Sequence, residues 1–395
     1  MNITLDNSSF LENPYPYYEK LRATDKPYFA PNLQDCKSEG MWLFSRYEDA
    51  VVIFKETSKI SKEIRFHRPQ GMSSVFDLNM LSRDGIDHSR LRALITKYFS
   101  FKYIDGLKEN ISIIAQELID NLKNKKEIDL IRDFAEPLPL ITIVDIMGVS
   151  RDDVPQIRKW SLSIGNGFDS LFASEYVLEQ QKIALKEFFH YIEDLLKAKK
   201  DTKDDKIICS LINAHQKNEL SYDELVSMIG FLLLAGHETT INLIGNGLWL
   251  LLSHPDQLQL LKNDMNLLPL AVEEILRYES PSQRSTFRIA LEPIEINGTK
   301  INKGDQFAVF IGSANRDKKE FENPEKFDIT RDPNRHLAFG IGIHNCLGKT
   351  LARVEAQIAF QEVLEYLSDL KLQETIPLWR KNSFFRGLKE LKVQS

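Results

Sequence analysis

The chain has 395 residues, of which 43% are hydrophobic and 27% are charged. Its length allows one large core, and we expect a single domain over residues 1–395 because no linker rich in proline, glycine or serine divides it. The net charge of -6 argues against general nucleic-acid binding. Three widely spaced cysteines, Cys36, Cys209 and Cys346, do not form a disulfide framework, so we expect a cytoplasmic protein.

The N-terminal segment carries neither a basic patch nor an apolar run, so we expect no signal peptide and no membrane anchor. The most apolar segment, residues 229–252, contains His237, Glu238 and two threonines. That polarity argues against a plain membrane span.

The first hundred residues alternate short helix and strand patterns. We expect a helix over 14–22, a strand over 41–44, a helix over 47–54 and a loop over 61–80 that carries Arg65. Residues 87–99 predict a helix with Asp87 as its N-cap. His88 and Arg92 lie four residues apart on one face of it. Taken alone, this pair is also typical of a solvated basic face.

Residues 106–200 read as successive amphipathic helices, with an apolar helix from Pro137 to near Gly148 and a loop over 165–174. The longest predicted helix follows. Ser221 and Glu224 form a capping box at its start, and Pro255 ends it. At about 1.5 Å per residue it would be roughly 50 Å long.

The middle of the longest predicted helix reads AGHETT, residues 235–240. An acid, Glu238, and a hydroxyl, Thr239, inside an apolar helix are costly to bury unless they are paired. The alternative is a threonine bonded back to the preceding turn and a glutamate at the surface.

Three structural signals follow. Glu274 and Arg277 lie three apart on a predicted helix and can form a buried pair, with Arg331 or His336 as a third member. The alternation over 294–301 around Asn297-Gly298 predicts a two-residue hairpin. Residues 382–392 predict a last hairpin.

The stretch FGIGIHNCLG, residues 339–348, places Cys346 behind a glycine-rich run and just ahead of a helix. The positive end of the helix macrodipole favours the thiolate. Gly340, Gly342 and Gly348 let the backbone approach something flat and bulky. A thiolate on such a loop suggests an axial ligand to haem iron, whereas a lone cysteine is otherwise typical of an inert buried thiol.

Phe339, Gly342, Cys346 and Gly348 match F-x-x-G-x-x-x-C-x-G, and the stretch therefore resembles the haem-ligand signature of the cytochrome P450 family. AGHETT equals that family's A-G-x-[DE]-T-[TS]. The resemblance covers nearly the whole chain. It implies a mainly α fold with small β-sheets, in which a long central helix crosses a haem pocket.

The resemblance also implies roles for individual residues. Cys346 would be the axial ligand of haem b, with Ala235, Phe339, Gly340 and Gly348 around the cofactor. Glu238 and Thr239 would relay protons. The residues implied to bind the haem propionates are His88, Arg92, Arg288 and His344.

The implied function is a haem-thiolate monooxygenase that hydroxylates or epoxidises a lipophilic natural-product intermediate, such as a polyketide, peptide, fatty-acid-like chain or terpenoid. A separate ferredoxin or flavodoxin-like donor with its reductase would supply electrons, and the substrate could be bound to a carrier protein. Arg65, Arg284 and Phe384 are the expected pocket residues, and Arg386 could join them. A peroxide-driven peroxygenase or decarboxylase, or a non-catalytic haem-based sensor, stays open as an alternative.

Overall fold

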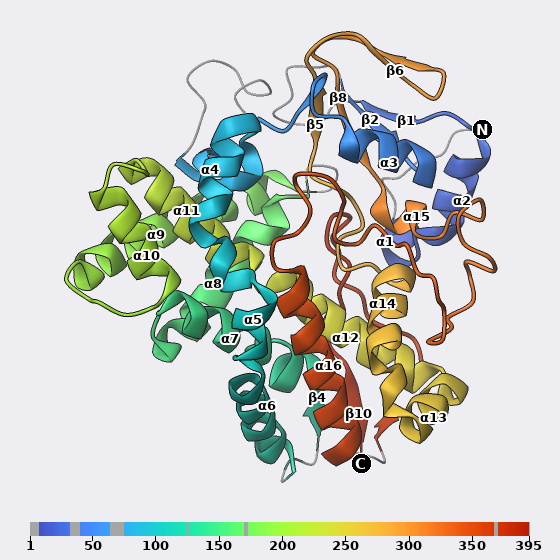
Figure 1. The fold of residues 1–395 in the computed structure, drawn as a ribbon. Helices are drawn as coiled ribbons and strands as arrows, with labels where there is room; N and C mark the ends of the chain where they lie inside the picture. Colours follow the sequence, from blue (N-terminus) through green and yellow to red (C-terminus); the bar gives the residue numbers. More distant parts are fainter. Residues whose placement is uncertain are drawn as a thin grey trace.

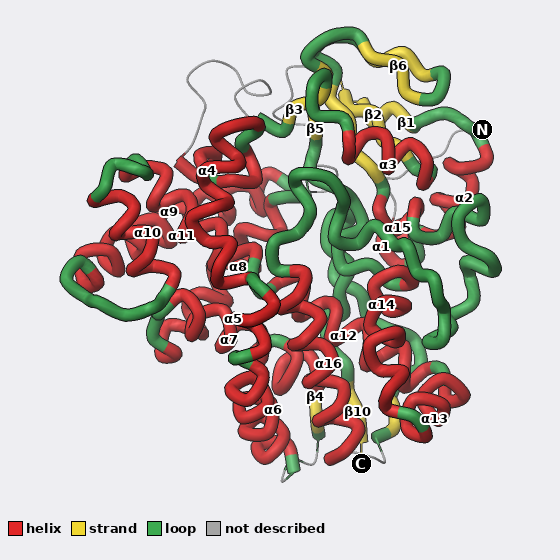
Figure 2. Tube along the Cα trace, in the orientation of Figure 1, coloured by secondary structure: helices red, strands yellow, loops and turns green. Residues whose placement is uncertain are grey.

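The computed structural model describes residues 8–31, 40–63, 75–123, 125, 127–169, 173–366 and 370–394. A large helical part and a smaller sheet-containing part meet around two central helices (Figure 1). The N-terminus lies beside the sheet and the C-terminus at the far end of the helical part. The mainly α fold with small sheets is thus confirmed, and Figure 2 shows how helices dominate the molecule.

The α-helices are α1 (Ser8–Glu12), α2 (Tyr15–Ala23), α3 (Tyr47–Lys55), α4 (Gly85–Ile95), α5 (Phe101–Asp105), α6 (Lys108–Leu122), α7 (Pro137–Met147), α8 (Val154–Gly167), α9 (Glu175–Lys199), α10 (Ile207–Gln216), α11 (Tyr222–Ala235), α12 (Glu238–Ser253), α13 (Pro255–Asn263), α14 (Leu268–Tyr278), α15 (Ile311–Ala314) and α16 (Lys349–Tyr366). The strands are β1 (Tyr28–Pro31), β2 (Gly40–Phe44), β3 (Ile60–Ser61), β4 (Ile128–Asp129), β5 (Arg288–Ala290), β6 (Ile294–Ile296), β7 (Thr299–Ile301), β8 (Gln306–Val309), β9 (Lys371–Leu372) and β10 (Lys392–Gln394).

The largest sheet has five strands in the order β1-β2-β8-β5-β3. Strands β2 and β8 pair in parallel with Met41 opposite Gln306, and the other neighbours are antiparallel. The sheet brings β5 beside β3, so Arg288 comes close to the segment that leads into α4. The predicted hairpin is β6–β7, and its turn residues Asn297 and Gly298 both have positive φ.

The main core is helical. It joins the apolar faces of α4, α6 to α14 and α16, while two smaller clusters cover the five-stranded sheet. Helix α7 starts with Pro137 at its first turn and ends at Gly148 in a left-handed conformation, as its sequence predicts. Helices α12 and α16 pack against each other at the centre of the molecule (Figure 1).

Three helix boundaries differ from the sequence predictions. The N-cap position of α4 is Asp84, not Asp87, because the chain turns at Gly85 with positive φ. Helix α8 continues to Gly167, into the predicted loop. The longest helix is broken into α11 and α12 at residues 236–237, although the Ser221–Glu224 capping box is present as predicted.

Candidate active site around Cys346

The loop that carries Cys346 is fixed by its own backbone. The amide of Cys346 donates to the carbonyl of Phe339 at 2.9 Å, and Asn345 donates to Gly342 at 3.2 Å. Gly340 and Gly342 have φ of 61° and 79°, which favour glycine. A Cβ on Gly342 would also lie 2.4 Å from the Phe54 carbonyl oxygen. These constraints fix the backbone around Cys346, which lies three residues before the start of α16.

The thiol of Cys346 is enclosed by protein and yet has an accessible surface. Burial raises its pKa above the ordinary value, and this effect outweighs the Gly348 amide and the charges of Arg92, Arg353 and Lys349, which lower it. That the position ahead of α16 favours the thiolate stays a prediction. A bound metal ion would change this balance, because a coordinating thiol is deprotonated outright.

The break between α11 and α12 lies at Gly236 and His237. A Cβ on Gly236 would lie 2.7 Å from the Ile143 side chain, so only glycine lets α11 pack this closely on α7. His237 is fully buried with φ of -130°. Its Nδ1 donates to the Leu233 carbonyl at 2.7 Å, and its Nε2 lies 2.9 Å from the Ser161 hydroxyl on α8. Burial lowers the pKa of His237 to about 4, so the ring is neutral at pH 7.

Ala235 ends α11 and Thr239 is the second residue of α12, so both lie at the break between the two helices. Ala235 is exposed and Thr239 is partly exposed, although 83% of the most apolar window of residues 222–253 is buried. Ala235 and Thr239 are therefore on the accessible side of a core helix pair. No described residue hydrogen-bonds the Thr239 hydroxyl, so the alternative of a bond back to the preceding turn is not realised.

Glu238 points into a buried ionic network. Its carboxylate accepts from Arg158 on α8 at 2.5 Å and from Arg380 at 2.7 Å. Glu136, which precedes α7, also accepts from both arginines, at 2.8 Å from Arg380. Burial acts to raise the pKa of Glu238, but the charges of Arg158 and Arg380 outweigh it and lower that pKa. The acid is thus held ionised, and it does not contact Thr239.

His88 and Arg92 lie on α4 and contact the loop of Cys346. The two ring nitrogens of His88 lie 2.9 Å from the Met80 carbonyl and 3.1 Å from the Ile343 carbonyl. Arg92 donates to the main-chain and side-chain oxygens of Asn345 at 3.0 and 2.8 Å. In this structure both residues tie α4 to the loop.

Arg288 and His344 both interact with Asp84. His344 donates from Nε2 to Asp84 at 2.7 Å, and its Nδ1 is buried without a hydrogen-bond partner among the described residues. Burial lowers the pKa of His344 to about 4. Arg288 is buried over the Phe54 ring, and burial lowers its pKa to about 10 while Asp84 opposes the shift. Asp84 was not expected from the sequence.

Glu274 and Arg277 form a fully buried pair with two contacts of 2.8 Å. The third basic member is Arg331, whose Nε donates to Glu274 at 3.1 Å. His336 instead contacts the neighbouring acid Glu273 at 3.0 Å. The cluster anchors the segment that leads to the Cys346 loop.

The expected pocket residues are only partly brought together. The guanidinium of Arg284 lies 5.3 Å from the centre of the Phe384 ring, and Arg284 is buried. Arg386 is not available to the site, because it pairs with Glu279 at 2.9 Å and donates to two N-terminal carbonyls. Arg65 lies outside the described residues.

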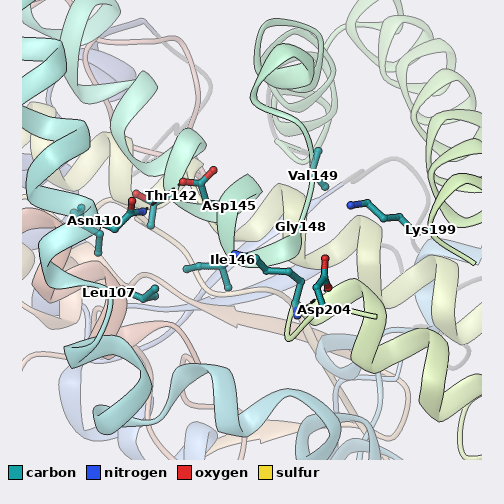
Figure 3. Close-up of a pocket in the computed structure, with 11 residues that line it drawn as sticks. Leu107, Asn110, Thr142, Asp145, Ile146, Gly148, Val149, Lys199 and Asp204 are labelled. Carbon is teal, nitrogen blue, oxygen red and sulfur yellow. Dashed lines mark hydrogen bonds between the residues drawn. The ribbon is translucent and has the colours of Figure 1, made fainter. Parts of the chain in front are cut away.

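A hollow of about 450 Å³ lies elsewhere, between α6, α7 and the segment after α9 (Figure 3). Its polar lining comes from Asn110, Thr142, Asp145, Lys199, Asp204 and Lys206. It includes none of the predicted site residues, so we do not assign the chemistry to it.

The residues around Cys346 fit the haem that the resemblance implies. The thiol is a suitable soft ligand for iron and faces an accessible space. Gly340 is open on the side where a Cβ would stand, with no atom within 4 Å. Arg288 and the Nδ1 atom of His344 are buried, and the acid beside both residues is Asp84. Together they match a flat iron-containing ligand with acidic side chains.

Similarity to known proteins agrees with this geometry. The family model "Cytochrome P450" matches residues 13–389. Cytochrome P450 CYP107DY1 of Priestia megaterium is 38% identical over 413 aligned positions, which cover 99% of each chain. The polyketide biosynthesis cytochrome P450 PksS of Bacillus subtilis is 37% identical and covers 89% of this chain and 88% of its own.

A solved structure is similar throughout. P450BioI in complex with an acyl carrier protein ligated to hexadec-9Z-enoic acid has a TM-score of 0.89 and 36% identity, over 98% of this chain and 100% of that chain. With a family match across residues 13–389 and near-complete coverage of these relatives, the chain belongs to the cytochrome P450 family of monooxygenases.

Proposed function

We propose that the protein binds haem b through Cys346 and uses dioxygen to hydroxylate or epoxidise a lipophilic natural-product intermediate. The observation that carries this proposal is the position of Cys346, which is exposed on a loop that leads into a helix packed on α12. When bound, haem supplies the iron that activates dioxygen, and thiolate donation favours cleavage of the O–O bond. The protein supplies the ligand, the positioning and the protons.

Named residues would hold the cofactor. Arg288 would bind a propionate by a charge-assisted hydrogen bond, which is stronger than a neutral one. His344 would donate from Nδ1 to a propionate when the ring is protonated, because Asp84 takes the hydrogen of Nε2. His88 and Arg92 would join them while keeping α4 on the Cys346 loop. Ala235, Phe339, Gly340 and Gly348 would line the faces of the ring.

Protons would pass through the break between α11 and α12. Thr239 lies on the accessible face with a hydroxyl that no described residue engages. Glu238 stands one residue before it and is joined to Arg158 and Arg380. We expect Thr239 to position the proton donor and Glu238 to pass on protons from solvent water, because the arginines that pair with Glu238 do not give up protons at pH 7.

The relatives, and not the pocket, support the proposed substrate class. PksS is named for polyketide biosynthesis, and P450BioI is seen with a fatty acyl chain on a carrier protein. We therefore expect a long apolar acyl or polyketide substrate, free or bound to a carrier protein. A ferredoxin or flavodoxin-like protein and its reductase would supply electrons in the cytoplasm.

The test is a spectrum followed by a turnover measurement. Reduced protein with carbon monoxide should show the red-shifted Soret band of a thiolate ligand, and Cys346→Ser should lose it. Turnover of acyl and polyketide candidates with reduced ferredoxin should exceed turnover with peroxide. Retention of the band in the variant, or turnover with peroxide alone, would contradict the proposal.

A further inference from the structure

Two buried basic side chains, Lys62 and Arg288, lie together beside the loop of Cys346. Lys62 follows β3 and Arg288 begins β5, and these two strands pair. Each residue is 7% exposed. Burial lowers the pKa of Lys62 well below its ordinary value, and the charge of Arg288 lowers it further. The strand pairing therefore brings like charges into one desolvated corner.

The nearest acid, Asp84, is already engaged. One of its oxygens accepts from the Ser61 hydroxyl at 2.6 Å and from the Lys62 amide at 2.8 Å. The other accepts from His344 at 2.7 Å. These bonds outweigh burial and hold the pKa of Asp84 well below its ordinary value. Asp84 thus fixes the backbone of Lys62 and the ring of His344, but it does not bond the ammonium of Lys62.

No other acid balances these charges within the described residues. Glu63, the next residue along the chain, faces Arg83 at 4.0 Å. Arg288 donates from Nη1 to the Ser285 hydroxyl and the Thr286 carbonyl. Its other nitrogens, and the ammonium of Lys62, have no acceptor among the described residues. Buried cations are ordinarily paired, so this corner is built for an anionic ligand.

The place of this corner identifies the anion. His344, which shares Asp84 with the backbone of Lys62, stands two residues before Cys346 in the same loop. We propose that Lys62 donates a charge-assisted hydrogen bond to a haem propionate beside Arg288, and that Asp84 positions Lys62 and His344 for this contact. The inference rests on the proposed haem and adds Lys62 and Asp84 to the residues that would hold it.

The test measures how fast haem leaves the holoenzyme. Haem transfer to excess apomyoglobin is followed by absorbance for the wild type, Lys62→Met and Lys62→Arg. Loss of a hydrogen bond between charged groups should accelerate haem loss by roughly ten- to hundredfold in Lys62→Met. Lys62→Arg keeps the charge and should stay close to the wild type. Lys59→Met is the matched control, because Lys59 is exposed and pairs with Glu292 at 3.1 Å.

The same rates are then measured with haem dimethyl ester, which lacks both propionate charges. With the ester, the wild type and Lys62→Met should release the cofactor at equal rates. Equal rates with ordinary haem, or an equal acceleration with both cofactors, would overturn the proposal. If Lys62→Met does not fold, the same haem-release rates are measured for Lys62→Gln, with the same expected results.

Failure of this inference is separable from failure of the proposed function. If the wild type shows no thiolate-ligated haem in its carbon monoxide spectrum, the proposed function fails. If that band is present and Lys62→Met holds haem as firmly as the wild type, only the role of Lys62 is wrong.

Discussion

Glu238 and Arg380 form an ion pair of 2.7 Å although they are 142 residues apart in the chain. The pair joins the first residue of α12 to the C-terminal segment. Arg158 on α8 contacts the other oxygen of the same carboxylate. The acid of the AGHETT motif is therefore shared between two arginines from different parts of the molecule, with Glu136 as the second acid of the network.

The first prediction concerns pH and the Glu238 network. The pKa of Glu238 is lowered from its ordinary value of 4.5, so its stabilisation is present above about pH 4.5 and is lost as the pH falls through the lower folded-state pKa. Glu238→Gln should reduce the free energy of unfolding by about 3–5 kcal/mol at pH 7, because it leaves buried arginines under-compensated.

Denaturant titrations at pH 7 and at about pH 3.5 to 4 check this prediction. The lower range lies below the pKa of glutamate in the unfolded chain. The difference between the wild type and Glu238→Gln should shrink at the acid pH. Glu295→Gln, on an exposed position of β6, is the control and should have little effect at either pH. A difference that is equal at both values would show that the carboxylate charge is not what stabilises the network.

The second prediction concerns Thr239. Thr239→Ala should still bind haem and substrate, because the side chain makes no described hydrogen bond. It should consume reducing equivalents while releasing more peroxide and less product, since a positioned proton donor is lost. Thr239→Ser keeps the hydroxyl and should restore most of the coupling. Peroxide and product measured per reducing equivalent decide the matter, and unchanged coupling in Thr239→Ala would leave Thr239 without a role in proton delivery.

The motif-bearing parts of the site could be predicted from the sequence, because their signals are local. The Cys346 loop, the capping box at Ser221 and the hairpin at Asn297-Gly298 each depend on a few adjacent residues. The break at Gly236 was not predicted from helical periodicity. At this break Gly236 lies close to Ile143 on α7, and such a tertiary contact is not visible in the sequence.

The partners of the motif residues could not be predicted, since they come from distant segments. Nothing local in the sequence marks Arg158 or Arg380 as a partner of Glu238. Lys62 and Asp84 were missed for the same reason, because the pairing of β3 with β5 brings Lys62 near Arg288, and Asp84 contacts His344 from the start of α4. Between Arg331 and His336 the sequence left the choice open, and only the packing around Glu274 decides for Arg331.

The third prediction concerns electron transfer. Lys349, the first residue of α16, is exposed three residues after Cys346. Arg353 is less available, because it pairs with Glu273 at 2.6 Å and stacks on Phe339. Lys97 is exposed and contacts Asp205 at 3.4 Å. Lys349 is therefore the clearest candidate for contact with an acidic electron donor.

Lys349→Glu should slow reduction by reduced ferredoxin several-fold at low ionic strength, because a rim charge acts mainly on the association rate. The effect should fade as salt rises, since exposed charges are screened over about 8 Å at physiological ionic strength. Lys300→Glu, on the β6–β7 hairpin, is the control. Stopped-flow rates that depend on neither salt nor Lys349 would place the docking surface elsewhere.

The fourth prediction concerns Arg284 and the substrate. Arg284 is 2% exposed and lies over Phe384, the other described residue expected in the pocket. The charge of Arg284 also lowers the pKa of Tyr18 on α2, although burial raises that pKa overall. Arg284 therefore lies near the N-terminal helices. Two roles follow from this placement: a structural cation stacked on an aromatic ring, or an anchor for a carboxylate or phosphate on the substrate.

Binding of a turned-over substrate to Arg284→Ala and Arg284→Lys separates these roles. Loss of a desolvated partner of an anion should weaken binding by about 2–5 kcal/mol in Arg284→Ala, with partial rescue by lysine. The loss should disappear for a matched substrate whose acidic group is esterified, because the charge that Arg284 recognises is then absent. Spin-state titrations of the haem report the dissociation constants. A loss below about 0.5 kcal/mol for the acidic substrate would assign Arg284 a structural role only.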